Sequence, residues 1–344
     1  MARGDVHLLG AALPLAAAPM AGGPTSPALA TAVAGAGAFP FLAAGYKTPE
    51  ALAAEIAAVR GTGAPFGVNL FAPAPALVGE ADYRRYAEEL QPEADAYGID
   101  LSGAPLIQDD DRWREKVDLL LADPVPVVSL TFGLPSADDA RELRRAGSRL
   151  LITVTTVDEA RAAAEVGADA LVAQGSDAGA HSGTHDPTRR ITPMPALDLV
   201  PAVVAATGLP VVAAGGVDGP QAVAALLDAG AAAVAVGTLL VRTDESGASR
   251  TYRDALGDPA FTSTAVTRAF TGRPARALRN GFLDRHDATA PTGYPAVHHL
   301  TRGLRQAAAE AGDTQRLHLW AGTGYRNATT GPASTVIERL AERL

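Results

Sequence analysis

The chain has 344 residues and a formal net charge of −9 at pH 7, from 38 Asp and Glu against 29 Lys and Arg. This acidic balance argues against nucleic acid or an anionic membrane as the main partner, because both bind clustered basic residues. Cysteine is absent, which excludes disulfides, thiolate nucleophiles, iron–sulfur clusters and cysteine-based zinc sites. The length fits a single α/β barrel with insertions.

The apolar segment 8–21 has the composition of a signal peptide, but we interpret it as the first strand of the fold. The positive charge of Arg3, which precedes the segment, is offset by the negative charge of Asp5. The apolar residues 13–18 are explained equally by a strand that ends in a loop. A second apolar run, 222–241, is interrupted by Asp228 and by two glycines, so no membrane span is expected. Cytoplasm is the default compartment.

Short apolar segments alternate with helical patterns along the whole chain. Thr48 and Pro49 are typical of a helix N-cap and first turn, and Gly167 is typical of the end of a helix over 157–166. Strands that are apolar on both faces and separated by helices form parallel sheets, and eight such units close into a barrel with its active site at the strand carboxyl ends. We therefore predict a (β/α)8 TIM barrel, with strands near residues 13–18, 39–43, 66–70, 127–131, 150–154, 170–173, 211–214 and 233–236.

Two regions exceed a minimal barrel. Residues 72–125 have room for two helices, 81–97 and 110–122, and about a hundred residues follow position 243. We predict a barrel core over 1–243 with a helical insertion at about 72–125, and a C-terminal extension over 244–344 near the barrel mouth. The last helix, 334–344, is amphipathic, so its apolar face packs either on its own barrel or on a partner subunit in a homodimer.

Three strand ends carry glycine-rich signals for ligand binding. The pairs Gly215-Gly216 and Gly237-Thr238 follow the last two strands, where exposed backbone N–H groups and a helix N-terminus bind phosphate in this fold. The alternative is that these glycines only permit tight turns. The sixth strand runs into Gln174 and a glycine-rich loop that ends in His181. A phosphate anchored there would place a flat heterocycle such as an isoalloxazine over Pro19, Met20, Ala21, Gly22, Asn69, Gln174 and Gly179.

These residues resemble the nitronate monooxygenases, formerly called 2-nitropropane dioxygenases, which bind FMN in a TIM barrel. The resemblance covers nearly the whole chain and keeps the family's order. Its motifs are Ala18-Pro-Met-Ala-Gly22, Gly67-Val-Asn-Leu70, Val127-Val-Ser-Leu-Thr-Phe-Gly133, Ala173-Gln-Gly-Ser-Asp-Ala-Gly-Ala-His181, Ala213-Ala-Gly-Gly216, Val236-Gly-Thr238, Phe270-Thr-Gly-Arg-Pro-Ala-Arg276 and Trp320-Ala-Gly-Thr-Gly324. Two motifs depart from the family: Asp177-Ala-Gly-Ala180-His181 replaces Glu-Ala-Gly-Gly-His, and Ala321-Gly-Thr323 replaces Ala-Gly-Gln.

The resemblance implies that FMN binds at the strand-end residues above and that His181 is the catalytic histidine. It implies oxidation of an alkyl nitronate or nitroalkane by O2 to a carbonyl compound and nitrite. A histidine near its ordinary pKa would act as base and as an anchor for the nitronate. Ser129, Thr131 and Tyr294 are the predicted substrate contacts. Tyr46 and Lys47 follow the second strand and could touch substrate, but a solvated loop is the preferred interpretation.

Several alternatives remain open. Flavin-dependent enoyl-acyl-carrier-protein reductases and NAD(P)H:quinone reductases resemble this family closely and differ in needing a hydride donor. A non-catalytic flavin-binding subunit and a flavin-free phosphosugar enzyme are further options. No metal site is predicted: His181 and His185 have the spacing of a helical zinc pair, but Gly183 between them opposes a helix. The pair His298-His299 is interpreted as a surface pair or as part of the mouth.

Overall fold

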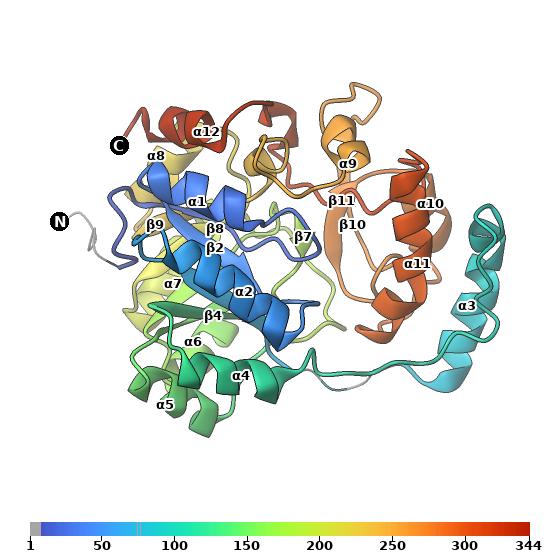
Figure 1. The fold of residues 1–344 in the computed structure, drawn as a ribbon, viewed down its shortest axis with the longest axis horizontal. Coiled ribbons are helices and arrows are strands. Elements are labelled where there is room, and N and C mark those ends of the chain that lie inside the picture. The colour runs from blue at the N-terminus through green and yellow to red at the C-terminus, as the bar shows by residue number, and fades with distance from the viewer. Residues whose placement is uncertain (1–7, 74, 76) are drawn as a thin grey trace.

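The computed structural model describes residues 8–73, 75 and 77–344. In this part of the chain, eight parallel strands close into a barrel in which the last strand pairs back onto the first (Figure 1). The predicted (β/α)8 barrel is therefore confirmed, and the predicted strands 39–43, 127–131, 211–214 and 233–236 have the predicted bounds. In barrel order the strands are β1 (Leu15–Ala17), β2 (Phe39–Ala43), β3 (Gly67–Phe71), β4 (Val127–Thr131), β5 (Arg149–Val154), β6 (Ala170–Gln174), β8 (Val211–Ala214) and β9 (Ala233–Val236).

The helices between the strands begin where the local sequence predicts. Thr48 accepts a hydrogen bond from the Ala51 N–H at 3.2 Å and Pro49 occupies the first turn, so the predicted N-cap is confirmed. Ser136 and Thr156 cap their helices in the same way. The helices that cover the barrel are α1 (Pro27–Gly35), α2 (Pro49–Arg60), α4 (Trp113–Ala122), α5 (Ala137–Arg145), α6 (Val157–Glu165), α7 (Ala196–Thr207) and α8 (Pro220–Asp228).

Helix α12 (Ala333–Ala341), at the C-terminal end, completes the ring. It packs against α1 and α8 and buries Val336, Ile337 and Leu340. Of the two predicted positions for this amphipathic helix, the structure shows the one on its own barrel.

The lower part of the barrel interior is packed with side chains. Phe39 and Phe41 from β2 meet Val127, Leu151 and Val212 from three other strands, and all of them are buried. This packing closes the amino-terminal end of the barrel and leaves open space at the carboxyl ends of the strands.

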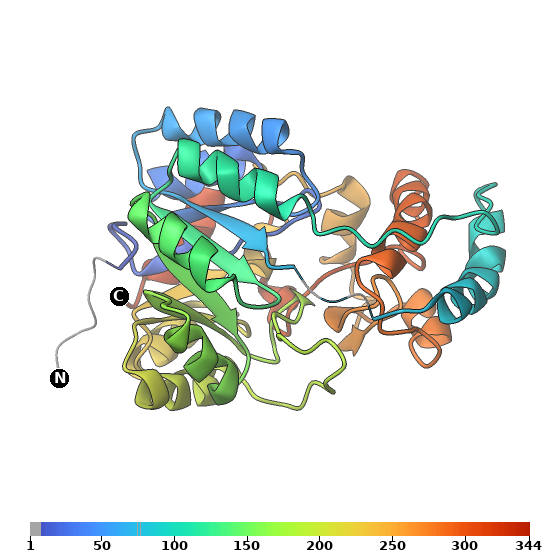
Figure 2. The ribbon, with the colours of Figure 1, turned by 90° about the horizontal axis from the view of Figure 1, so that it is seen from below.

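The two helices of the insertion after β3 lie in different parts of the molecule. Helix α4 covers the barrel, whereas α3 (Glu80–Asp95) lies far from the barrel beside the C-terminal extension (Figures 1 and 2). Helix α3 packs there on α11 (Ala296–Glu310), and α10 (Gly281–His286) belongs to the same lobe. This lobe has its own buried cluster, which includes Tyr83, Tyr86, Leu90, Phe270, Phe282, Val297 and Leu304.

A small antiparallel sheet joins the extension to the barrel mouth. It consists of β10 (Thr264–Thr267), β11 (Ala275–Leu278) and β7 (Ala180–His181), in the order β10-β11-β7. The sequence did not predict this sheet, because β7 has two residues and its partner lies far along the chain. The remaining elements are α9 (Arg250–Ala255) and the 3-10 turns η1 (Thr238–Leu240) and η2 (Tyr325–Asn327).

Within the described residues, no helix is both long enough and apolar enough to cross a bilayer.

Candidate active site

A cavity of about 630 Å³ opens at the carboxyl ends of the barrel strands. This volume is typical of a small-molecule site. The predicted cofactor and catalytic residues and two of the three predicted substrate contacts line it, whereas Tyr294 does not. The lining residues among the predictions are Pro19, Met20, Ala21, Gly22, Asn69, Ser129, Thr131, Gln174, Gly179, His181, Gly215, Gly216, Gly237 and Thr238.

Glycine is required where three segments meet at one end of this cavity. Gly215 has φ +101°, and a Cβ atom there would lie 2.9 Å from Ala178. A Cβ atom on Gly179 would lie 2.5 Å from the backbone nitrogen of Gly322. The loops after β6 and β8 and the segment around Gly322 therefore pack backbone against backbone.

The same segments present backbone donors to the cavity. Within the described residues, the N–H groups of Gly179 and Gly216 donate to no protein acceptor. Helix α8 starts at Pro220, where the sequence predicts it, whereas the short 3-10 turn η1 follows Gly237 in place of an α-helix. An anion here would be held by free backbone N–H groups.

Asn69 on β3 has its amide oriented by the neighbouring strand. Ser129 Oγ and Thr131 Oγ1 both donate to Asn69 Oδ1, at 2.8 and 3.0 Å. The amide oxygen is therefore engaged, and the Nδ2 amino group is the donor that Asn69 offers to a ligand. Ser129 and Thr131 line the cavity and also fix this amide.

Gln174 at the end of β6 holds the loop that follows it. Its Nε2 donates to the carbonyl of His181 at 3.1 Å, and its Oε1 accepts from the N–H of Gly183 at 2.7 Å. Both the Nε2 amino group and the Oε1 atom of Gln174 therefore bind backbone atoms. In this structure Gln174 contacts the cavity and acts as a clamp on the His181 segment.

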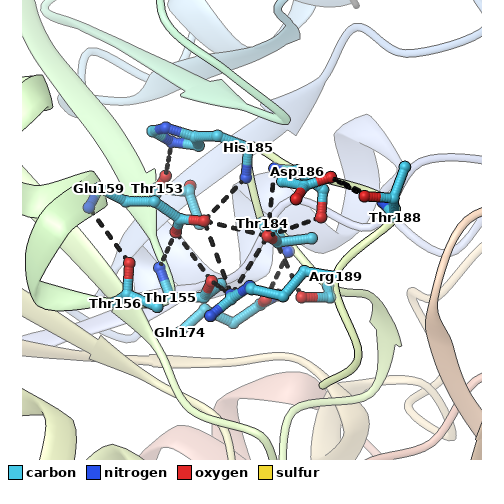
Figure 3. Close-up of polar contacts among 12 residues, drawn as sticks. Thr153, Thr155, Thr156, Glu159, Gln174, Thr184, His185, Asp186, Thr188 and Arg189 are labelled. Carbon is cyan, nitrogen blue, oxygen red and sulfur yellow. Dashed lines mark hydrogen bonds and ion pairs between the residues drawn. The ribbon is translucent and has the colours of Figure 1, made fainter. Parts of the chain in front are cut away.

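Glu159 on α6 anchors the same segment from outside the barrel (Figure 3). Its carboxylate accepts from Thr155 N–H at 2.6 Å, Thr155 Oγ1 at 2.8 Å, Thr184 Oγ1 at 3.0 Å and His185 N–H at 3.0 Å. Burial by itself raises the pKa of Glu159, but these hydrogen bonds and the neighbouring His185 hold it below its usual value. His185 points away to the carbonyl of Thr153, at 3.0 Å, and residues 180–185 are not helical.

His181 lies on β7, where the extension holds it by backbone pairing with Ala275 on β11. Its ring is surrounded by aromatic rings, with centroids 5.4 Å from Trp320, 5.6 Å from Phe132 and 5.7 Å from Tyr294. Tyr294 is therefore packed against His181, beside the cavity.

The pKa of His181 is far below its ordinary value. Burial lowers it from 6.5 to about 3, and the charges of Arg273 and Arg305 add to this effect. Arg273 is fully buried, with its guanidinium carbon 3.9 Å from the centroid of the Phe132 ring. The expectation of a histidine near its ordinary pKa is wrong, and His181 is neutral at pH 7.

One tautomer of His181 fits its hydrogen bonds. Nε2 lies 2.9 Å from Thr271 Oγ1, and that hydroxyl donates to the carbonyl of Arg273 at 3.4 Å. The hydroxyl then accepts a proton from Nε2, which leaves Nδ1 as an acceptor. Thr271 lies in the motif 270–276 on which the family resemblance rests, but no feature of the sequence marked its hydroxyl as part of the site.

Tyr46 lines the cavity, so its interpretation as part of a solvated loop is wrong. The residue has φ +68°, and its N–H donates to Asp111 Oδ1 at 2.9 Å. Lys116, which is buried, binds the other Asp111 oxygen at 2.7 Å and the carbonyl of Ala44 at 3.0 Å. A buried ion pair therefore fixes the unusual backbone that carries Tyr46.

Tyr46 is also part of a stack at the mouth. Its ring is parallel to that of His298, with centroids 4.1 Å apart, and its hydroxyl accepts from Tyr294 at 3.3 Å. Burial raises the pKa of Tyr46 to about 12, so the hydroxyl keeps its proton. His298 lines the cavity, which agrees with the interpretation of this histidine as part of the mouth. Its neighbour His299 pairs with Asp109, and His299 Nε2 lies 3.0 Å from Asp109 Oδ2.

Several residues in the cavity wall were missed by the sequence analysis. Phe132 and Trp320 lie in motifs that were noticed, but no feature of the sequence marked their side chains as part of the site. Arg305 and His318 carried no signal, because a basic residue in an amphipathic helix and a lone histidine are common on surfaces.

The chain matches known proteins over nearly its whole length. The family model described as nitronate monooxygenase matches residues 7–343. A probable nitronate monooxygenase of Staphylococcus aureus (strain MSSA476) is 34% identical over 343 residues, which cover 98% of this chain and 96% of the relative.

Solved structures agree with this match. The nitroalkane oxidase from Streptomyces ansochromogenes has a TM-score of 0.92 at 48% identity, covering 97% of this chain and 96% of its own. FabK from Thermotoga maritima has a TM-score of 0.75 at 27% identity, covering 100% and 96%. With this agreement in sequence and fold, the chain belongs to the nitronate monooxygenase family and is an oxidoreductase.

Proposed function

We propose that this enzyme oxidises alkyl nitronates with O2 to a carbonyl compound and nitrite, with FMN as its cofactor. The observation that carries the proposal is that His181 and the glycine strand ends of the barrel line the same cavity. Membership of the family and the similarity to a nitroalkane oxidase support the same chemistry.

The residues present fit FMN. Gly179, Gly215 and Gly216 lie on loops that pack closely against neighbouring backbone and side chains, and the N–H groups of Gly179 and Gly216 are free to bind a phosphate. Asn69 Nδ2 and the segment Pro19 to Gly22 would contact the ring system. Bound flavin supplies the redox chemistry between the nitronate and O2.

The state of His181 favours a preformed nitronate over a neutral nitroalkane. Its Nδ1 is free to accept a proton, but a base with a pKa of about 3 is weak for removing a proton from carbon at neutral pH. A nitronate is already an anion and needs no such step. We therefore expect kcat/KM to be higher for a nitronate than for its parent nitroalkane.

The first experiment is an absorption spectrum of the purified protein, followed by anaerobic mixing with propyl-2-nitronate, with NADH or with NADPH. The proposal predicts a flavin spectrum that the nitronate bleaches and that the pyridine nucleotides leave unchanged. Bleaching by NADH or NADPH alone would instead indicate a reductase of the same barrel. A colourless protein that cannot bind added FMN would overturn the proposal.

Replacing His181 by Asn tests its part in the reaction. We expect nitroalkane turnover to fall by about 10²-fold, the low end of the range for a general base because His181 is a weak one, with a smaller loss for the nitronate and FMN retained. His299→Asn is the control, because His299 does not line the cavity. Unchanged turnover of both substrates by the His181 variant would show that His181 takes no part in the reaction.

A further inference from the structure

The wall of the cavity is electropositive. Among its lining residues in the described part of the chain, Lys47, Arg302 and Arg305 are cationic and no aspartate or glutamate is present. Lys47 is neutralised by Glu55 at 2.6 Å. Arg302 is exposed to solvent, whereas Arg305 is 6% exposed. The buried charge on this wall is therefore that of Arg305.

Arg305 is held rigidly by its own helix, α11. Nε donates to Thr301 Oγ1 at 3.0 Å, and Nη2 donates to the carbonyl and Nδ1 of His298, at 3.0 and 3.1 Å. Nη1 donates to no acceptor among the described residues, and no described carboxylate forms an ion pair with this guanidinium. A buried cation without an anion is costly, so this wall is complementary to an anionic ligand.

Arg305 belongs to the same mouth as His181. His298, which binds Arg305, stacks on Tyr46, and Tyr46 accepts from Tyr294, whose ring packs 5.7 Å from that of His181. Because Tyr294 donates in that bond, the proton of the Tyr46 hydroxyl is free for a ligand. Burial lowers the pKa of Arg305 to about 10, which leaves it charged at neutral pH, whereas His181 is neutral.

We propose that Arg305 is the anion-binding residue of this site and holds the negatively charged oxygens of the nitronate through Nη1, with the Tyr46 hydroxyl as a second donor. The inference rests on the proposed function for the identity of the substrate. A nitronate carries its charge on two oxygens of one planar group, and guanidinium N–H groups are strong donors to such anions. His181 is then left to act as an acceptor, and the charge of the substrate is balanced by Arg305.

The kinetic test compares two substitutions in the lobe that contains α3 and α11. In the flavin-loaded enzyme, Arg305→Met should raise KM for propyl-2-nitronate by about tenfold or more, the usual loss for a hydrogen bond to a charged group. KM for the neutral nitroalkane should change by less than about threefold, because that substrate has no charge to lose. Arg85→Met removes an exposed cation of α3 that does not line the cavity and should leave both values within about threefold. Equal KM values for the nitronate in the wild-type enzyme and the Arg305 variant would overturn the proposal.

A binding test separates this inference from the proposed function. Nitrate, a planar anion that is not oxidised, should raise the Tm of the wild-type protein and of Arg85→Met in a concentration-dependent way, but not that of Arg305→Met. If nitrate binding depends on Arg305 while no nitronate is oxidised, the anion site stands and the proposed reaction fails. If nitrate stabilises all three proteins equally, Arg305 is not the anion site. If Arg305→Met does not fold, both tests are made with Arg305→Gln, which keeps an amide donor for the His298 carbonyl.

Discussion

Single side chains in this site acquire their chemistry from the residues packed around them. His181 is an ordinary histidine in the sequence, but burial and two arginines lower its pKa from 6.5 to about 3. Asn69 offers only its Nδ2 amino group to a ligand, because Ser129 and Thr131 donate hydrogen bonds to its Oδ1 atom. The type of each residue limits what it does, and its neighbours select one state.

The first prediction concerns the pH dependence of the reaction. Because the pKa of His181 lies at about 3, the residue is neutral both above and below pH 6.5. We expect kcat/KM for a nitronate to show no ionisation of this histidine between about pH 5 and 8. A steady-state profile in wild-type enzyme and in His181→Asn measures this. An inflection near pH 6.5 that the substitution removes would contradict the low pKa.

At the scale of elements, the site depends on short segments that hold one another. Strand β7 has two residues and exists because β11 pairs with it through Ala275 and Arg276. Gln174 then fixes the chain at the carbonyl of His181, and Glu159 fixes it further on, at the N–H of His185. The loop that carries the histidine is thereby held by the extension, by β6 and by α6.

Gly179 is predicted to be irreplaceable in this arrangement. In Gly179→Ala the new Cβ would lie 2.5 Å from the backbone of Gly322, so one of the two segments must move. We expect a loss of about 1–3 kcal/mol in the free energy of unfolding and a lower ratio of flavin to protein. Gly35→Ala is the matched control: no atom lies within 4 Å of the added group, and Gly35 is helical. Urea unfolding and the absorption spectrum give the two readouts, and equal stability of the two variants would contradict the close packing.

Glu159 is predicted to stabilise the segment after His181. Glu159→Ala removes the acceptor for the Thr184 hydroxyl and the His185 N–H, so we expect unfolding to become easier by about 1–3 kcal/mol. Turnover of the nitroalkane should fall with it, because His181 is less firmly placed. Glu165→Ala, on the exposed face of the same helix, should stay within about 0.5 kcal/mol of wild type. Urea unfolding at pH 7 compares them, and a Glu159 variant as stable as this control would show that the network is dispensable.

At the scale of the molecule, the enzyme consists of a barrel and a lobe that covers its mouth. The lobe joins α3 from the insertion to α10 and α11 from the C-terminal extension (Figure 2). Glu93 on α3 is central to this junction: it accepts from Arg285 Nε at 2.6 Å, His286 Nε2 at 3.0 Å and Arg316 Nε at 2.6 Å. Since α11 carries Arg305 and His298, the lobe also determines part of the cavity wall.

Acid should loosen this junction. Burial alone raises the pKa of Glu93, but its three partners outweigh burial and lower it from 4.5 to about 2. The stabilisation is therefore present above pH 4.5 and is lost as the pH falls toward 2. Glu93→Gln should lower the free energy of unfolding at pH 7 by about 1–3 kcal/mol, and this difference from wild type should narrow at pH 3.

Glu88→Gln, on an exposed position of the same helix, is the control and should be neutral at both pH values. Urea unfolding of the three proteins at pH 7 and pH 3 measures the effect. A difference between wild type and the Glu93 variant that does not depend on pH would contradict the shifted pKa.

Local sequence was sufficient to predict the barrel and one side of its site. Apolar strands, helix caps and glycines at strand ends act within a few residues of one another, so a pattern such as Thr48-Pro49 or Gly215-Gly216 indicates its structure directly. Parallel strands also meet at one edge, which is why residues from different strand ends were correctly expected to line one cavity.

The other side of the site depends on contacts between distant segments, and the tertiary structure alone decides it. Pairing of β7 with β11 places His181, the Lys116–Asp111 pair turns Tyr46 toward the cavity, and packing of α11 on α3 sets Arg305 in the wall. Ionisation is settled at the same level, because the pKa of a buried group depends on desolvation and on charges brought close by folding. Periodicity along the chain carries no information on these distances. From the sequence alone, Arg305 therefore cannot be distinguished from an exposed arginine on an amphipathic helix, although in the folded chain its guanidinium is buried and has no carboxylate partner among the described residues.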